Sequence, residues 1–219
     1  MKVAMILSGA GYLDGAEIRE SVLSLLYLDQ HEAQVDVYAP DIAQHDVVDH
    51  QTGQAQEASR NVLQEAARIA RGNVQPLVDL DVSAYDGLVI PGGYGVAKNL
   101  SDFATKGADC TVLPEFKQAI VQAVEQKKPI AAICIAPAVV AAALKGVASP
   151  TLTIGEDAGA AAAIEQCGAV HQCAATAESV ADDALAIYSC SAYMREDPIA
   201  DVAKGIERTI RSFVSACQV

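Results

Sequence analysis

Short runs of consecutive apolar residues recur along the chain. Such runs are typical of strands buried on both faces of a parallel sheet, because neither face meets water. On this pattern we expect strands at 3–7 and 130–133, and we also expect strands at 34–39 and 85–90. The stretch 180–190 instead predicts a β hairpin that turns at Asp182 and Asp183.

Segments with apolar residues at helical spacing separate the expected strands. A helix after the first strand carries Ile18, Val22, Leu25 and Leu26 on one face. Further helices are expected at 61–71, 114–127, 160–168 and 199–213, and a helix should follow the strand at 130–133.

The alternation of strands and helices predicts the fold class. It indicates an α/β protein with a doubly wound, mostly parallel sheet, helices on both faces and a small β hairpin near the C-terminus. The 219 residues, of which 52% are hydrophobic, suit a single domain over 1–219. The polar stretch from about 40 to 60 has no clear core face, and we expect an extended loop there.

Charge and hydropathy limit the partners. The 15 basic and 28 acidic residues give a formal net charge of −13, which opposes binding to nucleic acid or to an anionic membrane. No run of about 18 apolar residues suggests a membrane span. The N-terminal segment lacks the layout of a signal peptide, so we expect a cytoplasmic protein.

The chemistry of the chain points first to Cys134. An apolar run ends at this cysteine, and Pro137 begins an alanine-rich helical segment just after it. A strand that turns sharply into a helix lifts the side chain between them above the sheet and aims free helix N–H groups at it. Those groups favour the thiolate, which predicts a nucleophile. The alternative is a buried cysteine that acts as a small apolar residue.

Two further features accompany this cysteine at the expected strand ends. Gly92 and Gly93 follow the strand at 85–90, and a glycine pair lets backbone N–H groups approach a ligand. With the N–H of Ile135, that of Gly93 would form an oxyanion hole; a tight turn is the alternative. Glu17 is either a helix N-terminal carboxylate or a proton carrier beside Cys134.

The six cysteines are scattered without CxxC pairs, and we expect reduced thiols. The spacing of Cys167, His171 and Cys173 fits no zinc template, so no metal site is predicted. The glycine motifs fall short of a dinucleotide fingerprint, and no cofactor is expected.

Several motifs of the chain resemble those of a known family, the ElbB-type glyoxalases, also called isoprenoid-biosynthesis proteins with an amidotransferase-like domain. They belong to the PfpI-type, class I amidotransferase-like superfamily. The most diagnostic matches are 97–101 (Ala-Lys-Asn-Leu-Ser) and 133–137 (Ile-Cys-Ile-Ala-Pro). Other matching segments are 6–9, 14–15, 17–18, 60–63, 65–72, 91–93 with Gly95, 103–104, 106–108, 152–155 and 192–194.

The resemblance implies a flavodoxin-like sheet, a nucleophile at Cys134 and a partner acid at Glu17. It also implies a homodimer and a glyoxalase that needs neither glutathione nor metal, with a small dicarbonyl as substrate. Ala10 and Arg19 stand where the family commonly has a Cys and a His, which predicts weak activity if that His carries protons.

Other functions remain open at the level of sequence. No His follows His171, so a Cys–His–Glu glutaminase is not expected. A redox sensor, a regulatory protein that retains the enzyme fold, and a protein deglycase are the alternatives to a glyoxalase.

Overall fold

The computed structural model describes residues 1–218 and is built around one seven-stranded sheet. The strand order is β10-β11-β7-β6-β1-β2-β5. The β10 strand pairs antiparallel with β11, and the other neighbouring pairs in this sheet are parallel. The strands are β1 (Lys2–Ile6), β2 (Gln34–Ala39), β5 (Val74–Pro76), β6 (Gly87–Ile90), β7 (Ile130–Ile133), β10 (Val180–Asp182) and β11 (Ile187–Cys190).

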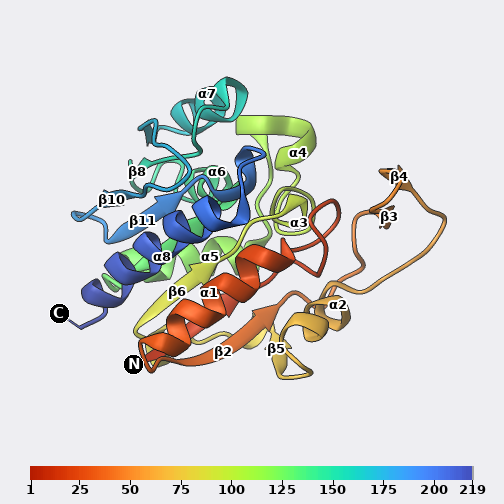
Figure 1. Cartoon of the computed structure of the whole chain (residues 1–219), viewed down its shortest axis with the longest axis horizontal. Coiled ribbons are helices and arrows are strands. Elements are labelled where there is room, and N and C mark those ends of the chain that lie inside the picture. The colour runs from red at the N-terminus through yellow and green to blue at the C-terminus, as the bar shows by residue number, and fades with distance from the viewer. Residues whose placement is uncertain (219) are drawn as a thin grey trace.

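Helices cover both faces of this sheet, which confirms the predicted flavodoxin-like α/β fold. In Figure 1, α1 and α8 lie side by side across the near face, and α5 and α6 lie behind the strands. One layer consists of α1 (Ile18–Gln30), α2 (Val62–Ile69) and α8 (Ile199–Ala216). The other contains α3 (Tyr94–Lys98), α4 (Phe103–Lys106), α5 (Pro114–Glu125), α6 (Ala136–Ala143) and α7 (Ala158–Gln166).

The central strands are apolar at successive positions because both their faces are buried. In and just after β1, Val3, Met5 and Leu7 pack toward α1 and α8, while Ala4 and Ile6 pack into the opposite layer. Since successive side chains of a strand point to opposite faces, a run of apolar residues satisfies both layers.

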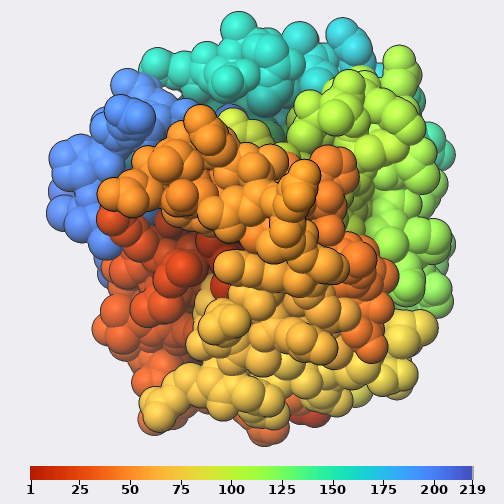
Figure 2. Space-filling view, turned by 90° about the vertical axis from the view of Figure 1, so that its right-hand side faces the viewer, coloured from red at the N-terminus to blue at the C-terminus, as the bar shows by residue number. Residues whose placement is uncertain are grey.

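Smaller elements complete the chain. The predicted hairpin at 180–190 is the β10–β11 pair. The polar stretch 40–60 holds a short hairpin of β3 (Val48–Asp49) and β4 (Gln54–Ala55), and Figure 2 shows this segment, in orange, lying across one face of the molecule. The other short elements are β8 (Thr151–Leu152), β9 (Val170–His171), η1 (Leu77–Asp79), η2 (Val82–Ala84), η3 (Gly107–Asp109) and η4 (Ala192–Met194).

The orientation of α1 differs from what its apolar pattern suggests. Ile18, Val22 and Leu26 are between 45% and 50% exposed, whereas Glu20 and Ser24 are fully buried. The buried serine hydroxyl donates to the carbonyl of Glu20 one turn back, so its polar group is satisfied inside the helix. The helix thus turns a mostly polar face toward the sheet, and that face carries a carboxyl group.

The topology marks one edge of the sheet as the expected position of a ligand site. β1 lies between β2 and β6, so the chain winds to one side through β2 and then returns to the other side through β6. In open parallel sheets, ligands bind at the carboxyl ends of the strands where this winding reverses. Within the described residues, no helix has the length and apolar character that crossing a bilayer requires.

Candidate active site

Cys134 lies at this edge, immediately after β7, on a strained turn. Its φ of +62° falls in the left-handed region that non-glycine residues rarely adopt. Its backbone N–H still donates to Cys190 O of β11 at 2.9 Å. The next residue, Ile135, is the N-cap of α6, and Pro137 lies in the first turn of that helix. The strand-to-helix turn predicted from the sequence is therefore present.

The carboxyl group that meets this thiol belongs to Glu20. Glu20 is fully buried and shares a hydrogen bond with the Cys134 thiol. Its Oε2 accepts from the N–H of Gly92 at 2.9 Å, and its Oε1 accepts from the N–H of Tyr193 at 3.3 Å. Backbone from the ends of β6 and β11 thus fixes the carboxyl group.

Of the two roles expected for Glu17, the structure shows the helix N-terminal carboxylate, and Glu20 takes the place beside the thiol that the resemblance implied for Glu17. Glu17 is the N-cap of α1, and its Oε2 accepts from the N–H of Glu20 at 2.6 Å. It is half-buried and lines the cavity beside Cys134, and burial raises the pKa of its carboxyl group. One helical turn separates the two glutamates, and the turn of α1 directs the second of them inward.

The predicted role of the glycine pair has a steric basis. A Cβ on Gly92 would lie 2.4 Å from Cys134 Cβ and 2.8 Å from Glu20 Oε2. Gly93 has a φ of +94°, and a Cβ there would lie 2.4 Å from Glu17 N. Any side chain at either position would therefore displace the groups of the site.

Two backbone N–H groups converge on the sulfur. Gly93 and Ile135 each donate a backbone hydrogen bond to Cys134, which favours the thiolate. They come from the ends of β6 and β7, two neighbouring strands. These are the two N–H groups that the sequence analysis assigned to an oxyanion hole; here they contact the sulfur, and their role in holding an oxyanion stays a prediction.

Burial nevertheless keeps the resting site protonated, contrary to our expectation of a thiolate. Loss of solvation raises the pKa of the Cys134 thiol well above its ordinary value, and the nearby Glu20 raises it further. Burial, with a smaller contribution from Glu17, raises the pKa of Glu20 to about 8. The two N–H donors oppose these effects without outweighing them.

A cavity of about 200 Å³ lies above the sulfur. Tyr193 and Met194, just after β11, form part of its wall, and the sequence analysis missed them because they belong to a short irregular turn. The lining residues are Tyr12, Glu17, Gly93, Tyr94, Cys134, Ile135, Asp157, Tyr193 and Met194.

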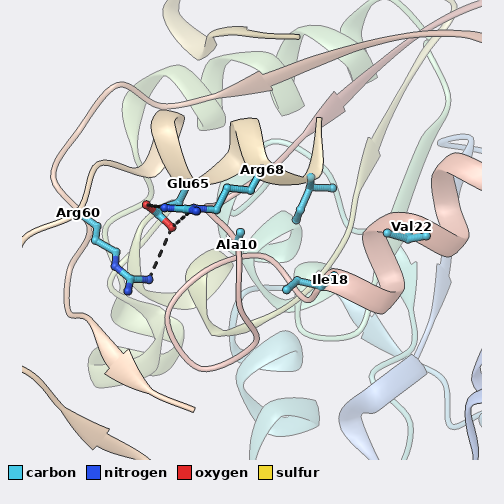
Figure 3. A pocket seen from close by; sticks show the side chains of 7 residues that line it. Ala10, Ile18, Val22, Arg60, Glu65 and Arg68 are labelled. Carbon is cyan, nitrogen blue, oxygen red and sulfur yellow. Dashed lines mark hydrogen bonds and ion pairs between the residues drawn. The ribbon is translucent and has the colours of Figure 1, made fainter. Parts of the chain in front are cut away.

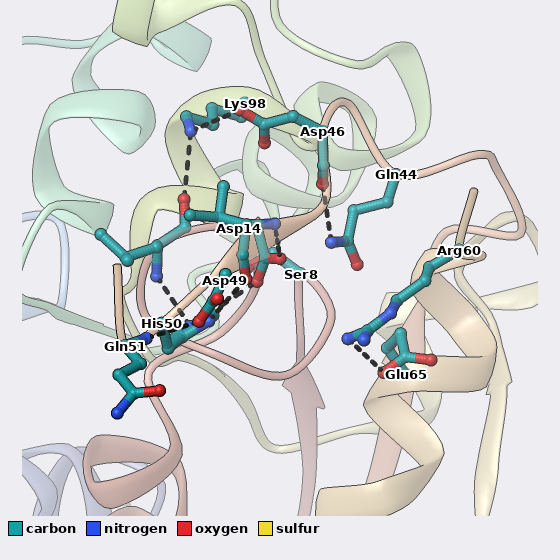
Figure 4. A network of polar contacts seen from close by, with 12 residues as sticks. Ser8, Asp14, Gln44, Asp46, Asp49, His50, Gln51, Arg60, Glu65 and Lys98 are labelled. Carbon is teal, nitrogen blue, oxygen red and sulfur yellow. Dashed lines mark hydrogen bonds and ion pairs between the residues drawn. The ribbon is translucent and has the colours of Figure 1, made fainter. Parts of the chain in front are cut away.

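A polar network supports the loop after β1 that carries Tyr12. Asn99 is buried, and its side-chain amide donates to the carbonyls of Ser8 and Asp14, both at 2.9 Å. Lys98 Nζ donates to Leu13 O at 3.1 Å and pairs with Asp46 at 2.9 Å. Figure 4 shows the two contacts of Lys98, together with His50, whose Nε2 accepts from the N–H of Leu13.

A second groove, between α1 and α2, has a different character. It measures about 420 Å³, and Arg60 and Arg68 both pair with Glu65 in its wall (Figure 3). Ala10 and Val22 also line it, and no cysteine does. Among the described residues, no three His, Cys, Asp or Glu side chains gather as a metal site would require.

Fold and site together define a flavodoxin-like protein with a cysteine on a strand-to-helix elbow. A model of the DJ-1/PfpI family matches residues 12–155. The chain therefore belongs to the DJ-1/PfpI family, and the resemblance inferred from its motifs is confirmed.

Relatives and solved structures agree with this assignment. The human "glutamine amidotransferase-like class 1 domain-containing protein 3, mitochondrial" is 39% identical over 96% of this chain and 81% of its own length. The crystal structure of an isoprenoid biosynthesis protein with an amidotransferase-like domain, from Ehrlichia chaffeensis, is 46% identical, covers 99% of both chains and has a TM-score of 0.94. A glyoxalase III from Candida albicans shares the fold, with 12% identity, a TM-score of 0.61 and coverage of 99% and 97%.

Proposed function

We propose that this protein is a cofactor-independent glyoxalase that converts glyoxal, or a similar small dicarbonyl, to the corresponding hydroxy acid. The observation that carries the proposal is the convergence of a thiol, a carboxyl group and two backbone N–H donors at one cavity. The DJ-1/PfpI family, in whose fold a glyoxalase III has been solved, supports it.

The first step joins the thiol to the aldehyde. Glu20, in its ionised form, takes the thiol proton while the Cys134 sulfur bonds to the aldehyde carbon, and the C=O π bond breaks. The developing oxyanion is held by the N–H groups of Gly93 and Ile135, and protonation gives a hemithioacetal. A single donor of this kind typically contributes about 3 kcal/mol of transition-state stabilisation.

The second step moves a hydrogen between the two carbons. Glu20 removes the proton from the sulfur-bearing carbon to give an enediol and returns it to the neighbouring carbon, which leaves a thioester. The first carbon is oxidised and the second is reduced, so the electrons balance within the substrate. Water then cleaves the thioester, releases the hydroxy acid and restores the Cys134 thiol.

This mechanism predicts a pH dependence. The attack requires the Glu20 carboxylate, and Glu20 has a pKa raised to about 8 by burial. Turnover should therefore rise with pH through that value.

The test is product formation in a buffer that contains neither amine nor thiol. Wild type should convert glyoxal to glycolate and methylglyoxal to lactate, and Cys134→Ser should fall to background. Cys173→Ser is the matched control because this exposed cysteine lies outside the cavity. Full turnover by Cys134→Ser would show that the mechanism is wrong.

Two alternatives, a redox sensor and a protein deglycase, differ from a glyoxalase in their chemistry. Peroxide oxidises thiolates far faster than thiols, so the raised pKa of Cys134, caused by burial, argues against a redox sensor. A deglycase would release its product from a pre-formed amine adduct, whereas a glyoxalase acts on the free dicarbonyl.

A further inference from the structure

The reaction cavity opens into a larger groove. This groove measures about 520 Å³ and shares Tyr12, Glu17 and Tyr193 with the cavity above Cys134. The combined volume of the cavity and the groove exceeds the volume of a two-carbon dicarbonyl. The remaining wall of the groove consists of Gly11, Ile18, Arg19, His50, Arg195 and Glu196.

Arg19 carries a positive charge in this groove that Glu17, the carboxylate nearest along the chain, attracts without forming an ion pair with it. Its guanidinium is exposed and makes no ion pair with a carboxylate among residues 1–218. Arg195, the other arginine of the groove, is neutralised by Glu156 at 2.8 Å and by Asp197 at 3.5 Å. Arg19 therefore has charge and N–H donors available for a ligand.

Tyr193 fixes Arg19 relative to the reacting atoms. Arg19 Nη1 donates to Tyr193 Oη at 3.3 Å, and the guanidinium lies 5.6 Å from the centre of the tyrosine ring. The backbone N–H of the same tyrosine donates to Glu20. One residue thus contacts both the carboxyl group beside the thiol and the arginine of the groove.

We propose that Arg19 binds a carboxylate at the far end of the substrate, so that the preferred substrates are 2-oxoaldehydes whose carbon chain ends in a carboxylate. The proposal rests on the glyoxalase function above. A guanidinium presents a planar fork of donors that matches a carboxylate. Arg195 is already paired with carboxylates, so of the two arginines that line the groove Arg19 is the one whose donors can meet the negative end.

A suitable substrate is 4,5-dioxopentanoate. Its aldehyde would meet Cys134 and its carboxylate would reach toward Arg19. The internal hydrogen transfer and hydrolysis described above would turn it into 2-hydroxypentanedioate, with water as the co-reactant. The neutral reference is 2-oxopentanal, which has the same chain length and no charge.

The experiment compares kcat/KM for these two dicarbonyls. Wild type should favour the anionic substrate, and Arg19→Gln should lower the ratio of the two values roughly tenfold, as loss of one charged hydrogen bond implies. Arg19→Lys should retain part of the preference. Arg211→Gln is the control of equal charge loss, because Arg211 lies near the start of β11, at the opposite edge of the sheet.

A second measurement does not require turnover. The rates at which iodoacetate and iodoacetamide alkylate Cys134 give an anion-to-neutral ratio, which should fall in Arg19→Gln and persist in Arg211→Gln. If the substrate ratio and the alkylation ratio are both insensitive to Arg19, the proposal is overturned while the glyoxalase function stands. If wild type converts neither dicarbonyl yet the alkylation ratio depends on Arg19, the glyoxalase function fails and the anion site is supported.

Discussion

The protonation of Cys134 is decided by a competition between its immediate neighbours. Burial and the adjacent Glu20 raise the pKa of the thiol, and the N–H groups of Gly93 and Ile135 oppose them. A helix start and two donors would suffice to ionise an exposed cysteine. Here Cys134 is only 6% exposed, so desolvation prevails and the proposed reaction depends on Glu20 to remove the proton.

The roles of Glu17 and Glu20 can be distinguished by how the reaction rate of a variant at each position depends on pH. Glu20→Gln removes the base and should reduce turnover about 10²-fold or more. Glu17→Gln removes a carboxylate that helps to raise the pKa of Glu20, so the rising limb of the rate should move to lower pH. Steady-state rates on glyoxal from pH 5 to 10 measure both effects. An unmoved profile in Glu17→Gln would contradict this assignment.

The buried Glu20 also predicts how stability depends on pH. Its pKa is about 8 in the folded protein because of burial, and the ordinary value is 4.5. The folded state therefore holds more protons than the unfolded state between these values, and the free energy of unfolding should fall as pH rises. The slope is at most about 1.4 kcal/mol per pH unit.

Urea unfolding of wild type and of Glu20→Gln between pH 5 and 8 tests this dependence. The variant cannot titrate at this position, so its stability should fall less steeply with pH than that of wild type. Parallel curves would indicate that Glu20 is ionised throughout this range.

At the scale of elements, the loop after β1 is held in place mainly by side chains that lie outside the loop. Asn99, the C-cap of α3, donates to Ser8 and Asp14 and accepts from the N–H of His45 at 2.9 Å. It thus joins the end of β1, the polar stretch 40–60 and the helix that follows the glycine pair. The wall of the cavity above Cys134 depends on these hydrogen bonds, because Tyr12 lies in the loop.

Removal of this amide should therefore weaken both fold and site. Asn99→Ala leaves buried carbonyls without a donor, and we expect a loss on the order of 3 kcal/mol in the free energy of unfolding. Turnover should also fall as the cavity wall loosens. Asn73→Ala, at an exposed asparagine, is the control. Equal stability of the two variants would show that water satisfies the carbonyls.

Elements with strong periodicity were predictable, and those held by distant contacts were not. The strands at 34–39 and 130–133 have the predicted bounds, and the apolar run of the second is buried on both faces. The edge strand β5 has three residues, and its pairing with β2 is what makes it a strand. The inward face of α1 was misassigned because three of its four buried residues are polar: Glu20, Ser21 and Ser24.

At the scale of the whole molecule, the sheet assembles the site from four strands. The ends of β1, β6, β7 and β11 contribute the Tyr12 loop, the glycine pair, Cys134 and Tyr193 respectively. These segments are widely separated in sequence and meet because parallel strands end at the same edge. The opposite edge, where the strands begin, contributes none of the residues that line the cavity.

The homodimer implied by the family resemblance stays a prediction. Sedimentation equilibrium should give twice the 22.8-kDa mass of the chain. The formal charge of −13 would weaken association at low salt through mutual repulsion, so the measurement belongs at 0.15 M salt or above. A mass of one chain across micromolar concentrations would contradict the prediction.

By itself the sequence determined the fold class, the strand-to-helix turn at Cys134 and the position of the glycine pair at a strand end, because these depend on local patterns: apolar runs, turn residues and short motifs. The tertiary structure alone decided which glutamate meets the thiol and whether that thiol is ionised. Both depend on the rotation of α1 against the sheet and on the water excluded by packing. Neither quantity is encoded in the spacing of neighbouring residues.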